Sequence, residues 1–152
     1  MHRLYETDEI SVFWNSDKCQ HATECRKGSP KTFDVNRRPW IDLTKAPTAE
    51  IWQAVSKCPS KALTCTYNHN VRIVFDEENH RCDAFRAGEH MGACQYSVDA
   101  DAWIIYHTEV SEELRGKNIA KRLVYRIVGE AERRNVTLLA TCTYAAKILK
   151  EN

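Results

Sequence analysis

The chain has 152 residues, of which 43% are hydrophobic and 28% are charged, and its formal net charge is +1. This composition is typical of a globular protein of one domain or two small ones. The balanced charge gives no electrostatic reason to expect nucleic acid or a membrane surface as a partner. No apolar stretch has the length of a signal peptide or of a spanning helix, so we expect a cytoplasmic protein.

Proline and glycine are distributed unevenly along the chain. All four prolines lie in the first 59 residues, whereas four of the five glycines lie after residue 87. We therefore expect two domains, residues 1–67 and 68–152, joined near the segment TYNHN at 66–70. The predicted fold class is a small α+β domain followed by a small α/β domain with a mixed sheet.

The first domain begins with an alternating segment, EISVFWN, which predicts a strand over residues 9–15. The segment CQHATECRKG predicts a short helical turn that ends at Gly28, and PTAEIWQAVSKCP predicts a helix. Thr48 is the expected N-cap of this helix, and Pro59 ends it. The apolar face of the helix consists of Ile51, Trp52, Val55 and Cys58. Cys58 should therefore lie at a helix end that faces the interior.

Three of the seven cysteines follow a recognisable spacing. An odd number of cysteines in a reducing compartment favours metal binding or reactivity over a closed set of disulfides. Cys19 and Cys25 fit the first and third positions of a C-x2-C-x2-C frame, and Cys58 stands before a proline, as a distal ferredoxin ligand does. Three thiolates can hold a 3Fe–4S cluster, or a 4Fe–4S cluster whose fourth iron takes another ligand. His21 is near enough in sequence to be that ligand.

Two other interpretations of these residues are open. Zinc is compatible with the ligand types of Cys19, His21, Cys25 and Cys58, although C-x-H-x3-C is not a usual zinc spacing. Alternatively, the cysteines are small buried residues that bind nothing. Cys65, seven residues after Cys58, is the one substitute ligand that the spacing offers.

Residues 5–65 resemble the divergent single-cluster 4Fe–4S ferredoxin family. The resemblance is carried by the strand segment, CQHATEC, TFDVNRRPWI and CPSKAL. It implies a small ferredoxin-like iron–sulfur domain with Cys19, Cys25 and Cys58 as cluster ligands, and it makes His21 a further candidate.

The second domain begins with four segments that predict consecutive strands, at residues 71–76, 82–88, 91–98 and 102–110. From residue 119, apolar residues recur with a period of 3.6, which predicts a long helix. Asn135 is expected to take the left-handed conformation after it. A short strand at 136–141 and a helix at 144–150 follow. This order predicts a mixed α/β sheet.

The segment LRGKNIAKRL joins the fourth strand to the long helix. An Arg-Gly loop that runs into a helix leaves several backbone N–H groups unpaired, and these can bind an anion. An ordinary glycine-containing turn is the alternative.

The order of strand, R-G-x-x-I-A, helix and strand resembles the GNAT acyltransferases. The segment HTEVSEELRGKNIAKRLV, with a Cys and an aromatic residue after the next strand, resembles a minimal GNAT subfamily over residues 70–150. The resemblance implies that acetyl-CoA binds at Val110, Arg115, Gly116, Lys117, Asn118, Ile119 and Ala120. Asn118 replaces the usual glycine, and asparagine tolerates a positive φ better than most residues.

Three residues near the expected acetyl-CoA site could carry chemistry. His107 and Glu109 are two apart on a strand, so they share one face. Acyl transfer to an amine needs a base and an acid, and either residue could be the base. Cys142 could be the acid or a nucleophile, and its place before a helix predicts a lowered thiol pKa. Each of the three also has an ordinary structural interpretation.

The sequence thus predicts an iron–sulfur-binding N-acetyltransferase that acts on an unidentified amine of a small molecule or a protein. The cluster would be structural or would sense redox or iron state. One alternative is an electron-transfer or redox-sensing protein whose GNAT half only binds CoA. The other is a zinc-stabilised acetyltransferase.

Overall fold

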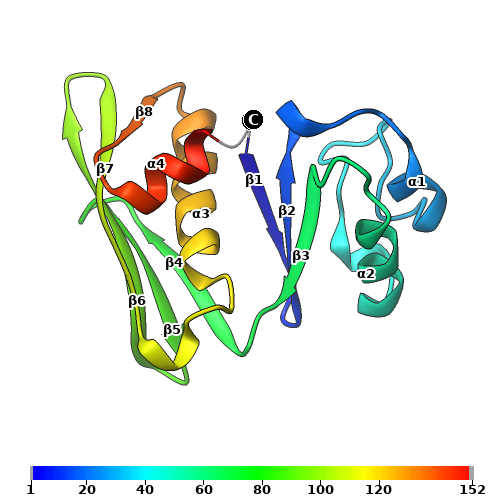
Figure 1. Ribbon diagram of the computed structural model, residues 1–152, viewed down its shortest axis with the longest axis horizontal. Helices are drawn as coiled ribbons and strands as arrows, with labels where there is room; N and C mark the ends of the chain where they lie inside the picture. Colours follow the sequence, from blue (N-terminus) through cyan, green and yellow to red (C-terminus); the bar gives the residue numbers. More distant parts are fainter. Residues whose placement is uncertain (1, 151–152) are drawn as a thin grey trace. The chain divides into compact units, whose positions relative to one another are not determined.

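The computed structural model describes residues 2–150 and divides into two compact units, one ending at Asn68 and one beginning at His69 (Figure 1). The first unit contains a three-stranded antiparallel sheet in the order β1-β2-β3. Its strands are β1 (His2–Glu6), β2 (Ile10–Asn15) and β3 (Leu63–Tyr67), and its helices are α1 (Glu24–Gly28) and α2 (Thr48–Ser56). Short 3-10 turns cover Ser16–Lys18 and Leu43–Lys45. All of β2 is buried, because it is the central strand.

The core of the first unit forms between the sheet and α2. Ile51, Ala54 and Val55 of α2 are buried against residues of β2 such as Ile10 and Val12. Two expectations for this helix were imperfect. Pro47, not Thr48, is its N-cap residue, because Thr48 already takes a helical conformation. Trp52 is only half-buried and stacks on Tyr67, with ring centroids 4.6 Å apart.

The second unit contains a five-stranded mixed sheet in the order β4-β5-β6-β7-β8 (Figure 1). The strands are β4 (Val71–Asp76), β5 (Arg81–Arg86), β6 (Glu89–Asp99), β7 (Ala102–Val110) and β8 (Thr137–Ala140). The first four are antiparallel, and β8 runs parallel to β7. The predicted mixed sheet is therefore confirmed.

Two helices complete the second unit. A 3-10 turn (Glu112–Leu114) leads into α3 (Ile119–Arg133), which packs across β4 to β8, and α4 (Thr143–Lys150) packs against β7, β8 and α3. The apolar face of α3 is buried, as the period of 3.6 predicts. Asn135 has a φ of 55°, so the left-handed conformation expected there is confirmed.

One irregularity in the sheet determines which way the end of β7 faces. Gln95 of β6 lies opposite His107, whereas the next residue, Tyr96, lies opposite Ile105. Tyr106 is therefore an extra residue on β7, which is a β-bulge. The bulge puts Ile105 and Thr108 on the same face of the strand although they are three residues apart. Within residues 2–150, no helix is long and apolar enough to cross a membrane.

Candidate functional site

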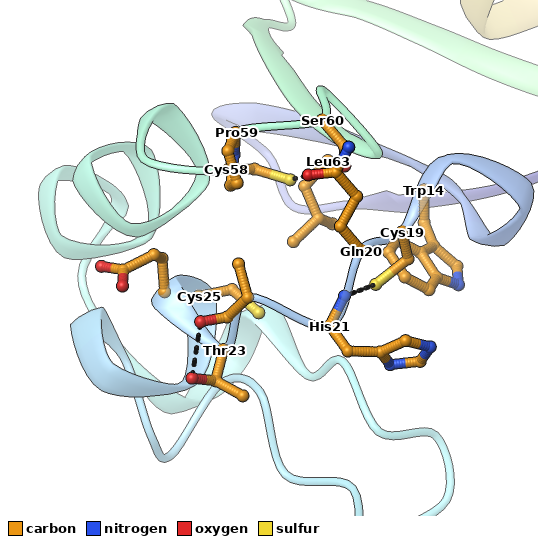
Figure 2. Close-up of a pocket in the computed structure, with 12 residues that line it drawn as sticks. Trp14, Cys19, Gln20, His21, Thr23, Cys25, Cys58, Pro59, Ser60 and Leu63 are labelled. Atoms are coloured by element: carbon orange, nitrogen blue, oxygen red, sulfur yellow. Dashed lines mark hydrogen bonds between the residues drawn. The ribbon is translucent and has the colours of Figure 1, made fainter.

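Three cysteines of the first unit lie around one pocket. Cys19 follows the first 3-10 turn, Cys25 belongs to α1, and Cys58 lies just beyond the end of α2. Figure 2 shows the three side chains approaching this pocket from different elements. Its other lining residues are Trp14, Gln20, His21, Ala22, Thr23, Glu24, Pro59, Ser60 and Leu63. The spacing of the three cysteines in the sequence is thus matched by proximity in space.

The loop between Cys19 and Cys25 has a strained backbone. His21 and Thr23 have φ values of 56° and 64°, in the left-handed region that side chains other than glycine and asparagine rarely adopt. The His21 N–H donates to the Cys19 Sγ at 3.4 Å. Residues in such conformations occur at functional loops and also in ordinary turns, as at His80 and Ala87.

Cys58 is held by the loop that follows it. Burial opposes ionisation of this thiol, but the backbone N–H groups of Leu63, Ala62 and Ser60 and the Ser60 hydroxyl donate hydrogen bonds to its sulfur, so its pKa is lowered. The Sγ lies 3.7 Å from the Ser60 Oγ. The segment CPSKAL therefore folds into a nest of donors around a thiolate, which is how proteins stabilise and tune sulfur ligands.

Cys25 has the opposite electrostatic environment. Its pKa is raised, first by burial and then by repulsion from the charges that Cys58 and Cys19 would carry. The Cys25 thiol would therefore ionise more readily with a positive group bound beside it. That is the chemistry of a metal or cluster site.

Two candidate ligands differ from these three. His21 is exposed, and Figure 2 shows its imidazole extending away from Cys25 and Cys58. Cys65 lies on β3 opposite Val12 and is not among the lining residues; burial raises its pKa to about 11. The structure therefore gives Cys65 no place as a substitute ligand.

Within residues 2–150, no three His, Cys, Asp or Glu side chains are close enough to hold a single metal ion. Zinc would need four ligands about 2.0–2.3 Å from one point. A cluster is larger, and each cysteine binds a different iron, so its thiolates stay further apart. The three cysteines around one pocket are compatible with such a cluster.

The expected CoA loop has the backbone of an anion site. Gly116 and Asn118 have φ values of 78° and 62°, so the expectation that Asn118 can take the left-handed conformation is confirmed. The first helical hydrogen bond of α3 runs from the Arg122 N–H to the Asn118 carbonyl at 3.0 Å. The N–H groups of Ile119 and Ala120 precede this bond, at the end of the helix where backbone donors have no intrahelical partner. Ile119 is buried, so its contribution to a ligand would come from the backbone.

The start of α3 is fixed to the sheet by a buried arginine. Arg122 is 1% exposed and donates to the Val71 carbonyl at 2.7 Å. This contact holds the helix N-terminus next to β4 without using the N–H groups that precede it.

His107 and Glu109 form an exposed pair on β7. The His107 Nε2 lies 3.4 Å from the Glu109 carboxylate, and both side chains are about half exposed. Glu109 lies opposite Ala93 of β6. The pair is thus accessible to a substrate, and the carboxylate can orient the imidazole.

Cys142 is the last residue before α4. Burial opposes ionisation of its thiol, but the neighbouring Thr108 hydroxyl and the backbone N–H groups of Ala145 and Tyr144 outweigh burial, so its pKa is lowered. This direction agrees with the one expected for a thiol before a helix. The Cys142 Sγ lies 3.5 Å from the Thr108 Oγ1.

The structure pairs these candidates differently from the sequence analysis. Successive side chains of a strand point to opposite faces, so the His107–Glu109 pair lies on one face of β7, and Thr108 with Cys142 lies on the other. The residue that contacts Cys142 is Thr108.

The sequence analysis missed a second polar group. Asp83 of β5 is 8% exposed and accepts from the Arg81 Nε at 2.9 Å and bonds the His90 Nε2 at 2.7 Å. Asp83 and Glu109 lie on either side of Ala93, which is opposite both. An aspartate inside an apolar strand was the available signal, but pairing across three strands is not visible in one sequence.

The fold and the two sites define a two-part protein, with a cysteine-lined domain and an acyltransferase-like domain. Residues 5–68 match the family described as divergent 4Fe-4S mono-cluster, and residues 81–152 match GCN5-related N-acetyl-transferase. The two matches cover separate parts of the chain, which confirms the fusion predicted from the sequence.

Three individual proteins are similar to parts of the chain. The uncharacterized protein YjdI of Escherichia coli strain K12 is 35% identical over 68 residues, which are 45% of this chain and 87% of that protein. A GCN5-like protein from Staphylococcus aureus, solved by NMR, is 27% identical with a TM-score of 0.44, over 54% of this chain and 80% of that one. The ribosomal-protein-S18-alanine N-acetyltransferase of Escherichia coli is 18% identical with a TM-score of 0.42, over 51% of this chain and 52% of that one.

Proposed function

We propose that this protein is an iron–sulfur-binding N-acetyltransferase that moves the acetyl group of acetyl-CoA to an amine. The observation that carries the proposal is the arrangement at the end of β7. A thiol with a lowered pKa, Cys142, contacts one face of this strand, and the exposed His107–Glu109 pair occupies the other. The N-terminus of α3, whose helix dipole favours an anion, follows the same strand.

The loop of residues 115–120 is proposed to bind the pyrophosphate of CoA. Gly116 and Asn118 turn the backbone so that several N–H groups precede the helix, and no Cβ at Gly116 blocks a close approach. The positive end of α3 favours the same anion. Val110, Arg115, Lys117, Ile119 and Ala120 complete the proposed cofactor site.

The reaction needs a proton to leave the amine and a proton to reach the CoA sulfur. The His107–Glu109 pair is the proposed base, since an imidazole beside a carboxylate can accept a proton from an ammonium group. The free amine then attacks the acetyl carbonyl carbon, the carbon–sulfur bond breaks, and the CoA thiolate leaves. In this route Cys142, as a thiol, donates a proton to the departing CoA sulfur. In the alternative route, the Cys142 thiolate first takes the acetyl group from CoA, and the amine then attacks the Cys142 thioester and releases the Cys142 thiolate.

Cys19, Cys25 and Cys58 are proposed to hold the cluster, with His21 as the candidate for the fourth position. His21 would have to turn its imidazole toward the pocket to do so. A bound cluster would supply a one-electron redox centre and would cross-link α1, α2 and the segment after β2. The structure therefore allows a structural or a sensing role.

The proposal is tested on the full chain purified without air. We expect a brown protein with bound iron and sulfide, and release of free CoA when acetyl-CoA and a panel of primary amines are supplied. Protection of Cys142 from iodoacetamide by acetyl-CoA would place the thioester near it. A coloured protein that binds CoA but releases none with any amine would instead indicate a non-enzymatic CoA-binding iron–sulfur protein. A colourless protein with bound zinc would overturn the cluster.

A further inference from the structure

Three side chains form a row beneath α4, on the face of the sheet that the helices cover. Cys94 of β6 lies directly opposite Thr108 of β7. The Thr108 hydroxyl donates to the Cys94 Sγ at 3.4 Å, and the Cys142 thiol donates to the Thr108 Oγ1 at 3.5 Å. Thr108 therefore bridges a fully buried thiol and a partly exposed one.

We propose that Thr108 is a positioning residue for Cys142, and that its hydroxyl turns from Cys94 to Cys142 when Cys142 loses its proton. This inference rests on the proposed role of Cys142 in acetyl transfer. It gives Thr108 a role that neither the sequence nor the family resemblance assigns to it. It also explains how the Cys142 thiolate can form without a charged partner.

The number of hydrogens on the Thr108 hydroxyl and the Cys142 thiol requires Thr108 to change its hydrogen-bond acceptor. A hydroxyl has one hydrogen to donate and two lone pairs to accept with. While Cys142 is a thiol, its hydrogen points at Oγ1 and the hydroxyl points at Cys94. When Cys142 is a thiolate it can only accept, so the hydroxyl must turn toward it to keep the contact. Hydrogen bonds to a charged group are stronger than those between neutral groups, which favours the turn.

Cys94 completes the row because it keeps its proton. Burial raises its pKa to about 12, so it stays a thiol at neutral pH and can donate to the lone pair that the turning hydroxyl exposes. The groups around Cys142 are then Cys94 and Thr108 from the sheet and the N–H groups of Tyr144 and Ala145 from α4. All of them can donate toward the thiolate, directly or through Thr108.

The fold explains why a threonine occupies this position. The extra residue Tyr106 shifts the alternation of β7, so Thr108 faces α4 on the same side as Ile105. Threonine is branched at Cβ and therefore has a stiff χ1. Its oxygen is thereby held between the two sulfurs.

The test is the pH dependence of Cys142 alkylation in the full chain. Iodoacetamide labelling is timed between pH 5 and pH 10, and the peptide that carries Cys142 is quantified by mass spectrometry. Thr108→Val keeps the shape but removes the hydroxyl. We expect it to move the midpoint of the rate curve to higher pH and to slow labelling several-fold below the midpoint. Thr108→Ser should restore the wild-type midpoint, and Thr137→Val, an exposed threonine of β8, should leave it unchanged.

The outcomes separate this inference from the proposed function. Equal midpoints for wild type and Thr108→Val, with a folded variant by circular dichroism, would overturn the role of Thr108 whatever the enzyme does. So would a Thr108→Ser midpoint that stays with Thr108→Val. A shifted midpoint together with unchanged acetyl transfer would support Thr108 as the partner of the thiolate and would contradict a catalytic role for Cys142.

Discussion

Gly28 of α1 lies directly against Ala54 of α2. A Cβ added to Gly28 would come within 2.9 Å of the Ala54 Cβ and 3.0 Å of its Cα, which is closer than real side chains approach. This contact joins the helix that carries Cys25 to the helix that ends just before Cys58. The glycine thus controls the separation of two proposed cluster ligands without touching either sulfur.

We therefore expect Gly28→Ala to reduce cluster content although no ligand is changed. The added methyl group must push α1 and α2 apart, at a cost of about 1–3 kcal/mol in the stability of the first unit. Iron per chain and thermal unfolding are the measurements, with the exposed Lys27→Ala on the same helix as control. Full iron content at wild-type stability in Gly28→Ala would show that the helix contact does not fix the site.

A cysteine series tests the three proposed ligands. Cys19→Ser, Cys25→Ser and Cys58→Ser should each remove most of the bound iron and destabilise the first unit, because cluster binding and folding of a small core are coupled. Cys65→Ser should keep its iron, since Cys65 lies outside the pocket. Iron and sulfide analysis of the variants, purified without air, measures their cluster content. Iron retained at wild-type level in any of the first three would exclude that cysteine as a ligand.

The loop before α3 is tested by two substitutions with opposite effects. Asn118→Gly should preserve or tighten CoA binding, because glycine adopts a φ of 62° at least cost. Gly116→Val should weaken binding strongly, since a branched side chain is strained at a φ of 78° and blocks the approach of a ligand to the backbone. Calorimetric titration with CoA measures both. Equal affinities would place the cofactor elsewhere.

A buried carboxylate near the end of α3 makes the stability of the second unit depend on pH. Glu130 is 4% exposed; burial raises its pKa, but Arg134, Arg126 and Arg133 outweigh burial and lower it below the ordinary 4.5. Arg134 also pairs with Glu77 of the turn after β4 at 2.9 Å. The ionised form is therefore stabilised by folding. Its contribution is fully present above the unfolded pKa and is lost as the pH falls through the lower folded value.

Glu130→Gln should accordingly destabilise the protein at pH 7 by about 1–3 kcal/mol. The difference from wild type should shrink as the pH is lowered below 4.5, where the wild-type carboxylate takes up its proton. Urea unfolding of both proteins at several pH values gives the two curves. A difference that stays constant down to pH 2.5 would mean that the arginines do not hold Glu130 ionised.

Local patterns in the sequence predict much of this fold. The period of 3.6 predicts α3, and strongly β-forming residues predict β4 to β7. The edge strands β1 and β3 were not predicted from the sequence, because β1 lies at the chain start and β3 follows CPSKAL without a clear alternation. The spacing of Cys19, Cys25 and Cys58 predicts that they line one pocket, because their motif is specific.

The sequence predicts less well on which face of the sheet each side chain lies. His107 and Glu109 were correctly placed together by alternation. The pairing of Cys142 with Thr108 depends on the β-bulge at Tyr106 and on the parallel pairing of β7 with β8, and neither leaves a periodic signal in the sequence. The contact between Gly28 and Ala54 also leaves no periodic signal, because the two residues are 26 positions apart and belong to different helices.

The most direct test of the central claim is the acetyl transfer rate of the full, cluster-containing chain, measured as CoA released from acetyl-CoA in the presence of amines, for wild type and Cys142→Ala. The account predicts measurable release by wild type with at least one amine. It also predicts a much lower maximal rate for Cys142→Ala at nearly unchanged CoA affinity, which is the pattern of a lost transition-state interaction. Equal rates for the two proteins, at equal CoA affinity, would contradict the assignment of acetyl-transfer chemistry to this end of β7.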